Sequence, residues 1–110
     1  MKSYTSLEQS KKLAEVLPLE SADMHWQYIE EDNGQLQWFC FPKDFSINQH
    51  DTVSAWSLAA LLNVLPSSTL DSSDDHHYRL HCMERFTEWY DNPIDACYEM
   101  ILKLKEKNML

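Results

Sequence analysis

The sequence predicts a small α+β domain in which helices and antiparallel hairpins follow one another in the order αββαββα. Capped stretches of helical periodicity at the start and the end of the 110-residue chain indicate the outer helices. Between them, aromatic runs flank the dipeptide Asn33-Gly34, which is typical of a tight hairpin turn. The length and the apolar content of 44% suit one domain with one core, residues 1–110.

Residues 6–17 are predicted to form the first helix. Ser6 and Gln9 have the spacing of a capping box, in which each side chain binds the backbone of the other residue. Apolar residues then recur at helical spacing until Pro18 ends the run.

Residues 24–29 and 36–41 are predicted to be paired antiparallel strands. Both runs are rich in aromatic residues, and Asn33-Gly34 lies between them. Since Asn-Gly is the preferred pair for positive φ at two successive positions, we expect a type I′ turn there.

Residues 55–65 are predicted to form a second helix, with Ser54 as its N-cap and Pro66 beyond its end. This segment is apolar nearly all round, so we expect other elements to cover it on several sides. The next residues, 67–75, are polar and are expected to form a loop.

Residues 76–82 and 86–90 are predicted to form a second pair of strands. The connection around Glu84-Arg85 lacks glycine, so its turn chemistry is weaker than that of the first hairpin.

The last helix has the strongest start signals in the chain. Asn92 suits the N-cap, Pro93 the first helical position, and Asp95 the first turn, where the helix dipole favours an acid. The residues that follow place one apolar face on this helix: Ile94, Cys97, Tyr98, Ile101 and Leu104.

Residues 13–18 and 61–66 have similar sequences, and each segment precedes a predicted strand pair. A duplicated unit would place four antiparallel strands beside one another. A helix that ends at proline is also common chemistry, so the similarity fits both a duplication and a coincidence.

Two segments of the chain, residues 55–66 and 91–102, resemble parts of short uncharacterised proteins of gut Bacteroides-type bacteria and their phages or mobile elements. The resemblance implies a bacterial, cytoplasmic setting and a similar arrangement of helices and hairpins. It brings no known activity and no binding residues.

Gly34 is the only glycine, and this scarcity excludes several kinds of site. A phosphate-binding P-loop, a dinucleotide fingerprint, a nucleophile elbow and an EF-hand loop all need glycine at fixed positions. We therefore expect no cofactor.

The formal net charge of −9 arises from 18 acidic and 9 basic residues. Such a surface repels phosphate backbones and anionic lipids, so we expect neither direct nucleic-acid binding nor membrane binding. The expected partner is a neutral or basic protein, or a second copy of the chain.

Three cysteines, Cys40, Cys82 and Cys97, form no C-x-x-C pair and lie among apolar or alternating residues. Buried, reduced thiols in the cytoplasm are expected. The N-terminus has no secretory apolar region, and the longest uncharged stretch, residues 52–70, has too short an apolar core to span a bilayer.

Candidate metal ligands are Asp75, His77 and His81, with Cys82 next in the chain. On a helix, His77 and His81 would share a face in a metal-binding arrangement. On a strand, which the pattern favours, His77, Arg79 and His81 form a solvated face and Cys82 points the opposite way. A base beside the Cys82 thiol is then absent, and we expect neither a metal nor a catalytic residue.

Trp26, Trp38 and Trp89 are the candidate interaction residues. Trp26 and Trp38 flank the first hairpin turn, where cross-strand aromatic contacts ordinarily stabilise a sheet. An uncovered strand face would instead leave these rings in an exposed apolar patch, and such patches mark interfaces.

Three functional hypotheses follow. The first is a non-catalytic protein-interaction or regulatory module. The second is an inhibitor of phage or mobile-element type whose carboxylates mimic DNA. The third, which the spacing favours least, is a metal-dependent or thiol enzyme built on Asp75, His77, His81 and Cys82.

Overall fold

The structure is a computed structural model that describes residues 2–44, 52–73 and 75–110. It confirms the α+β class and the alternation of helices with antiparallel strands. The elements are, in chain order, α1 (Leu7–Val16), the 3₁₀ helix η1 (Leu19–Ser21), β1 (Met24–Glu30), β2 (Leu36–Pro42), β3 (Thr52–Ala55), α2 (Leu58–Val64), β4 (Ser68–Ser72), β5 (Tyr78–Cys82), β6 (Arg85–Phe86) and α3 (Pro93–Glu106).

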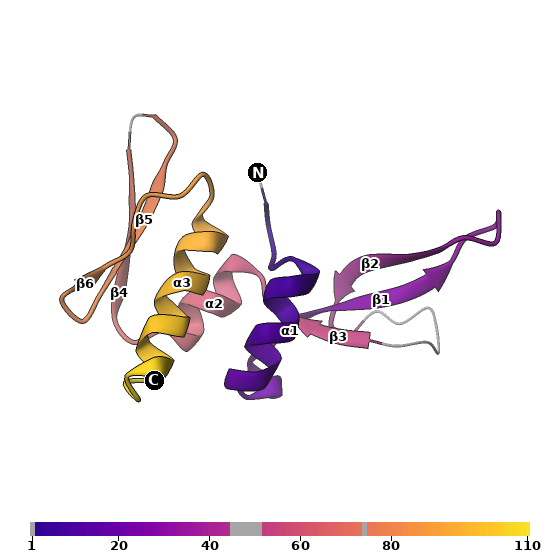
Figure 1. Ribbon diagram of the computed structural model, residues 1–110, viewed down its shortest axis with the longest axis horizontal. Helices are drawn as coiled ribbons and strands as arrows, with labels where there is room; N and C mark the ends of the chain where they lie inside the picture. Colours follow the sequence, from indigo (N-terminus) through magenta and orange to yellow (C-terminus); the bar gives the residue numbers. More distant parts are fainter. Residues whose placement is uncertain (1, 45–51, 74) are drawn as a thin grey trace.

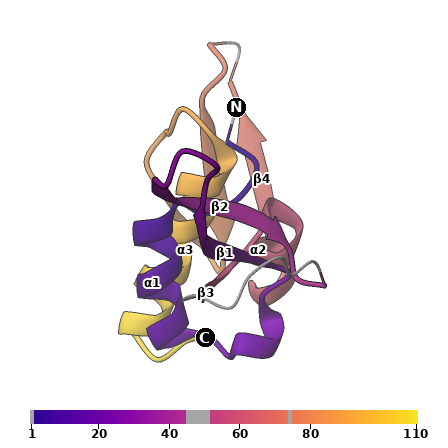
Figure 2. The same ribbon diagram turned by 90° about the vertical axis from the view of Figure 1, so that its right-hand side faces the viewer.

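The strands form two separate three-stranded sheets, in the orders β2-β1-β3 and β4-β5-β6. Figure 1 shows the three helices between these sheets, which lie toward opposite ends of a molecule measuring 49 × 32 × 20 Å. In the turned view of Figure 2, the first sheet faces the reader in front of α3. The four strands side by side that a duplicated unit would give are therefore not found in the described residues, because the helices separate the two sheets.

Helix α1 has the predicted capping box. The Gln9 amide donates to Ser6 Oγ (3.2 Å), and the Ser6 amide donates to Gln9 Oε1 (3.1 Å). The helix ends at Val16, and the Leu17 amide closes its last turn on the Leu13 carbonyl (2.8 Å) before Pro18.

The first hairpin is confirmed, but its predicted turn type is wrong. Gly34 has φ 84°, whereas Asn33 is not among the described residues with positive φ. The Gly34 amide donates to the Glu31 carbonyl (2.9 Å), and the Glu31 amide donates to the Gln35 carbonyl (2.7 Å). These bonds define a three-residue loop, in which a type I turn precedes a glycine with positive φ.

The predicted second helix is shorter than expected, and its N-cap is Ser57 rather than Ser54. Ser54 lies in β3, which pairs with β1 from Met24↔Ala55 to Gln27↔Thr52. The Ser57 hydroxyl accepts from the Ala60 amide (3.2 Å) and donates to the Asp23 carboxylate, which also accepts from the Ser57 amide (2.9 Å). Pairing with β1 thus overrides the helical pattern up to residue 55.

Residues 68–72, expected in a loop, form strand β4 and pair with β5 from Ser68↔Cys82 to Ser72↔Tyr78. Strands β5 and β6 are joined by Met83 and Glu84, whose φ angles are 53° and 65°. Positive φ at both central residues is the requirement of a type I′ turn. Neither residue type favours that conformation, so the turn holds local strain.

The core brings together all three helices and β5. Four members of the predicted face of α3, Ile94, Cys97, Ile101 and Leu104, are fully buried, and Tyr98 is half-buried against them. They pack with fully buried residues from other elements: Leu13, Trp56, Leu61 and Leu80. The asparagine cap and the Pro93 start of α3 are confirmed.

The similarity between residues 13–18 and 61–66 has a structural counterpart. Leu13 and Leu61 are fully buried. The Leu17 amide donates to the Leu13 carbonyl, and the Leu65 amide donates to the Leu61 carbonyl in the same way. Both helices therefore end in the same way, two residues before a proline and with a leucine as the C-cap between.

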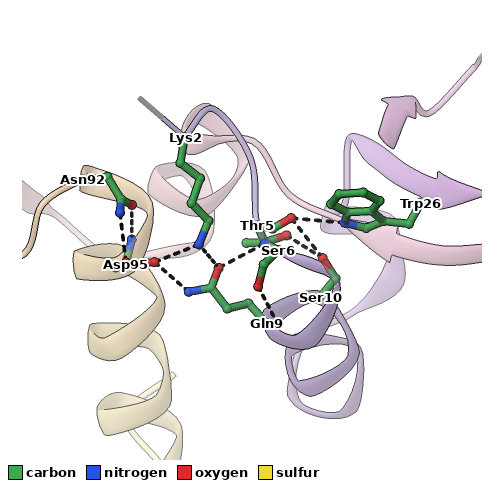
Figure 3. Close-up of polar contacts among 8 residues, drawn as sticks. All are labelled: Lys2, Thr5, Ser6, Gln9, Ser10, Trp26, Asn92 and Asp95. Atoms are coloured by element: carbon green, nitrogen blue, oxygen red, sulfur yellow. Dashed lines mark hydrogen bonds and ion pairs between the residues drawn. The ribbon is translucent and has the colours of Figure 1, made fainter. Parts of the chain in front are cut away.

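Buried Thr5 joins the two halves of the chain (Figure 3). Its amide donates to the Trp56 carbonyl (2.9 Å), its hydroxyl accepts from the Trp56 amide (3.1 Å), and its carbonyl accepts from the Trp26 indole (3.1 Å). The Thr5 and Ser10 hydroxyls are also 2.7 Å apart. One residue thus connects α1, the first sheet and the segment that leads into α2.

A second polar network, also drawn in Figure 3, joins the N-terminal segment to α3. Asp95 Oδ1 accepts from Lys2 Nζ (2.9 Å) and Gln9 Nε2 (2.8 Å), and Oδ2 accepts from Asn92 Nδ2 (2.9 Å). Burial raises the pKa of Asp95, but the hydrogen bonds from Lys2, Gln9 and Asn92 outweigh it and leave the pKa below its ordinary value.

No helix in the described part of the chain combines the length and the apolar character needed to cross a bilayer.

Substituting Asp95→Asn should lower the free energy of unfolding at pH 7 by about 1 kcal/mol. This is less than a fully buried charged hydrogen bond contributes, because the Asp95 side chain is about a third exposed. Folding lowers the pKa of Asp95 below its value of about 3.8 in the unfolded chain. The carboxylate therefore stabilises the protein fully at pH values above 3.8, and this stabilisation is lost as the pH falls through the pKa of the folded state. Urea unfolding at pH 7 and pH 3 measures the difference.

The matched control is Glu15→Gln, which removes an exposed carboxylate of an i,i+3 pair with Lys12. It should change stability little at either pH. A difference between wild type and Asp95→Asn that is the same at pH 7 and pH 3 would contradict the role given to the network.

Candidate functional site

The outer face of the second sheet carries the most unusual group of side chains in the structure. Leu80 and Cys82 of β5 are buried on the side of α3. Since side chains alternate along a strand, Arg79 and His81 project from the opposite side. The prediction that Arg79 and His81 share a face of a strand is confirmed, whereas His77, which was predicted on the same face, precedes β5.

Arg79 lies at the centre of this face. Its guanidinium carbon is 4.4 Å from the centroid of the Phe86 ring and 4.6 Å from that of Trp89, distances typical of cation–π contacts. Nη2 donates to Oδ2 of Asp71, the residue directly across from it on β4 (3.2 Å). We call Asp71, Arg79, His81, Phe86 and Trp89 the Arg79 face.

His81 completes the face by stacking on Phe86. The two rings are 4.2 Å apart and inclined by 7°, and the residues are cross-strand partners. Phe86 therefore contacts both His81 and Arg79, and the cross-strand pairs Asp71–Arg79 and His81–Phe86 lie on one surface.

A β-bulge places Trp89 on this surface. His81 pairs with Phe86 and Tyr78 with Tyr90, so residues 79–80 of β5 lie opposite residues 87–89. Regular alternation from Phe86 would direct Trp89 toward the core, and the extra residue reverses that direction. The bulge also explains why β6 ends at Phe86 although the strand was predicted to continue to residue 90.

Thr87 holds the bulge against β5. Its hydroxyl accepts from the Leu80 amide (2.9 Å) and donates to the Glu88 carbonyl (2.9 Å), while its own amide donates to the Leu80 carbonyl (3.0 Å). Tyr78 and Tyr90 exchange two further backbone bonds, of 2.7 and 2.8 Å. The hydroxyl thereby replaces a backbone acceptor that the bulge removes.

The segment around this face exposes large apolar side chains. The described residues include five large hydrophobic residues that are exposed, and three of them lie within residues 83–89: Met83 (45%), Phe86 (49%) and Trp89 (44%). The other two, Leu19 and Leu36, belong to separate elements. Concentration of this kind indicates an interaction surface more strongly than isolated exposure does.

The structure brings two of the candidate metal ligands together. Asp75 and His77 line a shallow pocket of about 390 Å³ with Ser73 and Trp89. His77 Nε2 is 3.5 Å from a carboxylate oxygen of Asp91. His81 stacks on Phe86 instead, and the described residues contain no group of three or more His, Cys, Asp or Glu that could hold a metal ion.

The cysteine thiols lie in surroundings that favour the protonated form. Burial raises the pKa of Cys97 to about 12, and burial together with Asp23 raises that of Cys40 to about 11. Burial also raises the pKa of Cys82, whose Sγ lies 3.8 Å from the Pro66 carbonyl on the core side of β5. A nucleophilic thiol needs the opposite shift.

The three tryptophans proposed for interaction are not on one surface. Trp26 and Trp38 share a face of the first sheet, where Trp26 lies 5.6 Å from the Tyr4 ring and Trp38 lies 5.0 Å from Tyr28. The Trp26 indole is also bound to the Thr5 carbonyl. Trp89 belongs to the second sheet and is the one of the three that is exposed rather than half-buried.

A larger pocket, of about 460 Å³, lies between the C-terminal parts of the three helices. Its lining is mainly apolar, and Glu20 and Lys105 are the charged residues in it. It contains none of the candidate residues and none of the thiols, so it is a weaker candidate than the Arg79 face.

Comparison with known proteins finds no matching family, no matching curated protein and no matching solved structure.

Two residues of the Arg79 face, Asp71 and Phe86, are not among the candidates that the sequence predicts. Asp71 lies in a segment with one apolar residue among five, so nothing indicated a strand there. The sequence predicts Phe86 and Trp89 in one strand, where residues three apart point to opposite faces. The bulge has no recognisable pattern of residues here. The role of Thr87 is seen only in the structure, from its hydrogen bond with the Leu80 amide.

Substituting Thr87→Val should lower the free energy of unfolding by about 1–3 kcal/mol, because the shape is kept while the fully buried Leu80 amide loses its acceptor. Urea unfolding followed by circular dichroism measures this. Thr69→Val is the matched control, since Thr69 is exposed on β4. Equal stability of the two variants would contradict the role of Thr87 in holding the bulge.

Proposed function

We propose that this chain is a non-catalytic protein-interaction module that binds a protein partner through the Arg79 face. One observation carries the proposal. The guanidinium of Arg79 is held between two half-exposed aromatic rings on a sheet face that the helices leave uncovered.

The residue types of this surface support protein binding. Phenylalanine, tryptophan, methionine and arginine are enriched in interfaces, and tryptophan and arginine dominate their energetic centres. Phe86, Trp89 and Met83 are exposed to nearly half of their surface. Arg79 and Phe86 are already held in place by contacts within the protein, so binding would cost little side-chain entropy.

The surrounding charge indicates a basic partner. The face itself contains Asp71, which is paired with Arg79, and the exposed acids Glu84, Glu88 and Asp91 lie close to its residues in the chain. The whole chain carries a net charge of −9. A partner with an apolar centre and basic residues around it would match both the rings and the rim.

The strained turn beside the face supports a functional role. Met83 and Glu84 both have positive φ, in a position where asparagine and glycine would be unstrained. Backbone strain of this kind is concentrated at functional sites. The exposed Met83 side chain is the feature that Asn-Gly could not supply.

The double variant Phe86→Ser/Trp89→Ser should retain its fold and lose its partner. Tagged wild-type and variant proteins are compared by affinity capture from cells that naturally produce the protein, followed by quantitative mass spectrometry. We expect at least one basic protein to be captured by wild type and reduced tenfold or more with the variant.

Two matched variants separate the proposal from its main alternative. Leu19→Ser removes a similarly exposed apolar side chain elsewhere and should leave capture unchanged. Glu84→Gln/Glu88→Gln removes two exposed carboxylates and should weaken capture only modestly. Capture that depends on the carboxylates and ignores Phe86 and Trp89 would overturn the proposal in favour of DNA mimicry.

A further inference from the structure

Within the described part of the chain, strand β2 has an open edge, which is a separate feature from the Arg79 face. In the described residues the sheet order is β2-β1-β3, so β2 pairs with β1 on one side alone. Its seven residues, Leu36–Pro42, carry no charge and include Trp38, Phe39 and Phe41. An uncharged, apolar edge of this length is a template for pairing with another strand.

The hydrogen bonds at the two ends of β2 identify the backbone groups on this edge. Gln35 and Lys43 both bond toward the β1 side, through the Glu31 amide and the Asp23 carbonyl. Because antiparallel pairs alternate, the odd-numbered residues of β2 face β1 and the even-numbered ones face outward. Leu36, Trp38 and Cys40 therefore offer both amide and carbonyl groups, and Pro42 offers its carbonyl only.

The other edge strands are protected in ways that β2 is not. Strand β4 has five residues and contains Asp71, β3 has four residues, and β6 has two, of which one is Arg85. Short length and charged side chains are the usual protection of a sheet edge. In β2 the one residue of a type that protects a sheet edge is Pro42, which lies at the end of the strand and has no amide hydrogen.

We propose that the open edge of β2 binds the same strand of a second copy of this chain, antiparallel and about a two-fold axis at Trp38. This register pairs Leu36 of each copy with Cys40 of the other and keeps Pro42 outside the hydrogen-bonded region. The two sheets would form one continuous sheet with an isologous interface. The inference concerns a different surface from the proposed function and does not rest on it.

The charges around β2 favour a second copy in this orientation. Three acids precede the strand, Glu30, Glu31 and Asp32, whereas Lys43 and Asp44 follow it and cancel. Antiparallel pairing places the acidic end of each copy beside the lysine-containing end of the other. Parallel pairing would bring two acidic ends together, at a cost in repulsion.

Aromatic side chains on both sides of the strand would add apolar contact. Trp38 lies on one face and packs against Tyr28, whereas Phe39 and Phe41 lie on the other with ring centroids 6.5 Å apart. In the proposed register the two Trp38 rings become neighbours across the axis. Because β2 carries no charge, pairing through it adds little repulsion between two copies of a chain of net charge −9.

Sedimentation equilibrium of the full chain tests the proposal, and we expect a dimer. The variants Trp38→Lys and Trp38→Glu should each have a dimer dissociation constant at least tenfold higher than that of wild type, because like charges would face each other across the axis. An equal mixture of the two variants should associate again. Leu19→Lys, on an exposed site elsewhere, is the control and should remain dimeric.

A disulfide test fixes the register and does not require a change at Trp38. Leu36→Cys should form a covalent dimer with Cys40 of the second copy under a mild oxidant, since their Cα atoms would be within disulfide range. Gln37→Cys, on the other face of the strand, should not.

Three results would overturn the proposal: a monomer at all concentrations, a dimer that Trp38→Lys leaves intact, or cross-linking that is equal for Leu36→Cys and Gln37→Cys. The variant Phe86→Ser/Trp89→Ser should remain a dimer. Partner capture tests the proposal for the Arg79 face, and dimerisation tests the proposal for the β2 edge. Because the variants of each surface should leave the other property unchanged, the failure of one proposal can be told from the failure of the other.

Discussion

The packing of helix α3 against strand β5 is the interaction on which the C-terminal half depends. The fully buried face of α3 lies against Leu80 and Cys82, which project from one side of β5. A strand buried on one side must present its remaining side chains on the other. Because three helices lie between two sheets, nothing in the described residues covers the outer face of the second sheet (Figure 1).

The uncovered face is ordered by its own contacts rather than by the core. Arg79 is fixed by Asp71 and by two aromatic rings, and Thr87 anchors the bulge that directs Trp89 outward. Each contact has a local cause, and together they produce a rigid surface with apolar rings at its centre and acids around it. Rigidity matters because a surface that is already ordered loses little entropy when it binds.

Elements with local chemical signals could be predicted from the sequence. Helix α1 has its capping box, and α3 has the Asn92 cap, Pro93 and a regular apolar face. Both signals act within a few residues and do not depend on the rest of the fold. The first hairpin was found for the same reason, because aromatic runs surround a glycine that must take positive φ.

Elements that depend on distant partners could not be predicted. Strand β3 overrides a helical pattern because it pairs with β1, and β4 forms from a polar segment because β5 provides its partner. Only part of the Arg79 face could be predicted. The shared side of Arg79 and His81 follows from the alternation of side chains along a strand. Asp71 joins the face through the pairing of β4 with β5, and Trp89 joins it through the bulge. No residue type marks those features in advance.

We propose that a protein partner contacts the outer face of the second sheet. Photocross-linking tests it most directly, with benzoylphenylalanine placed at Phe86, and separately at Leu19, in cells that naturally produce the protein. We expect one discrete cross-linked protein from position 86 and none from position 19. No product from position 86, or the same products from both positions, would contradict it.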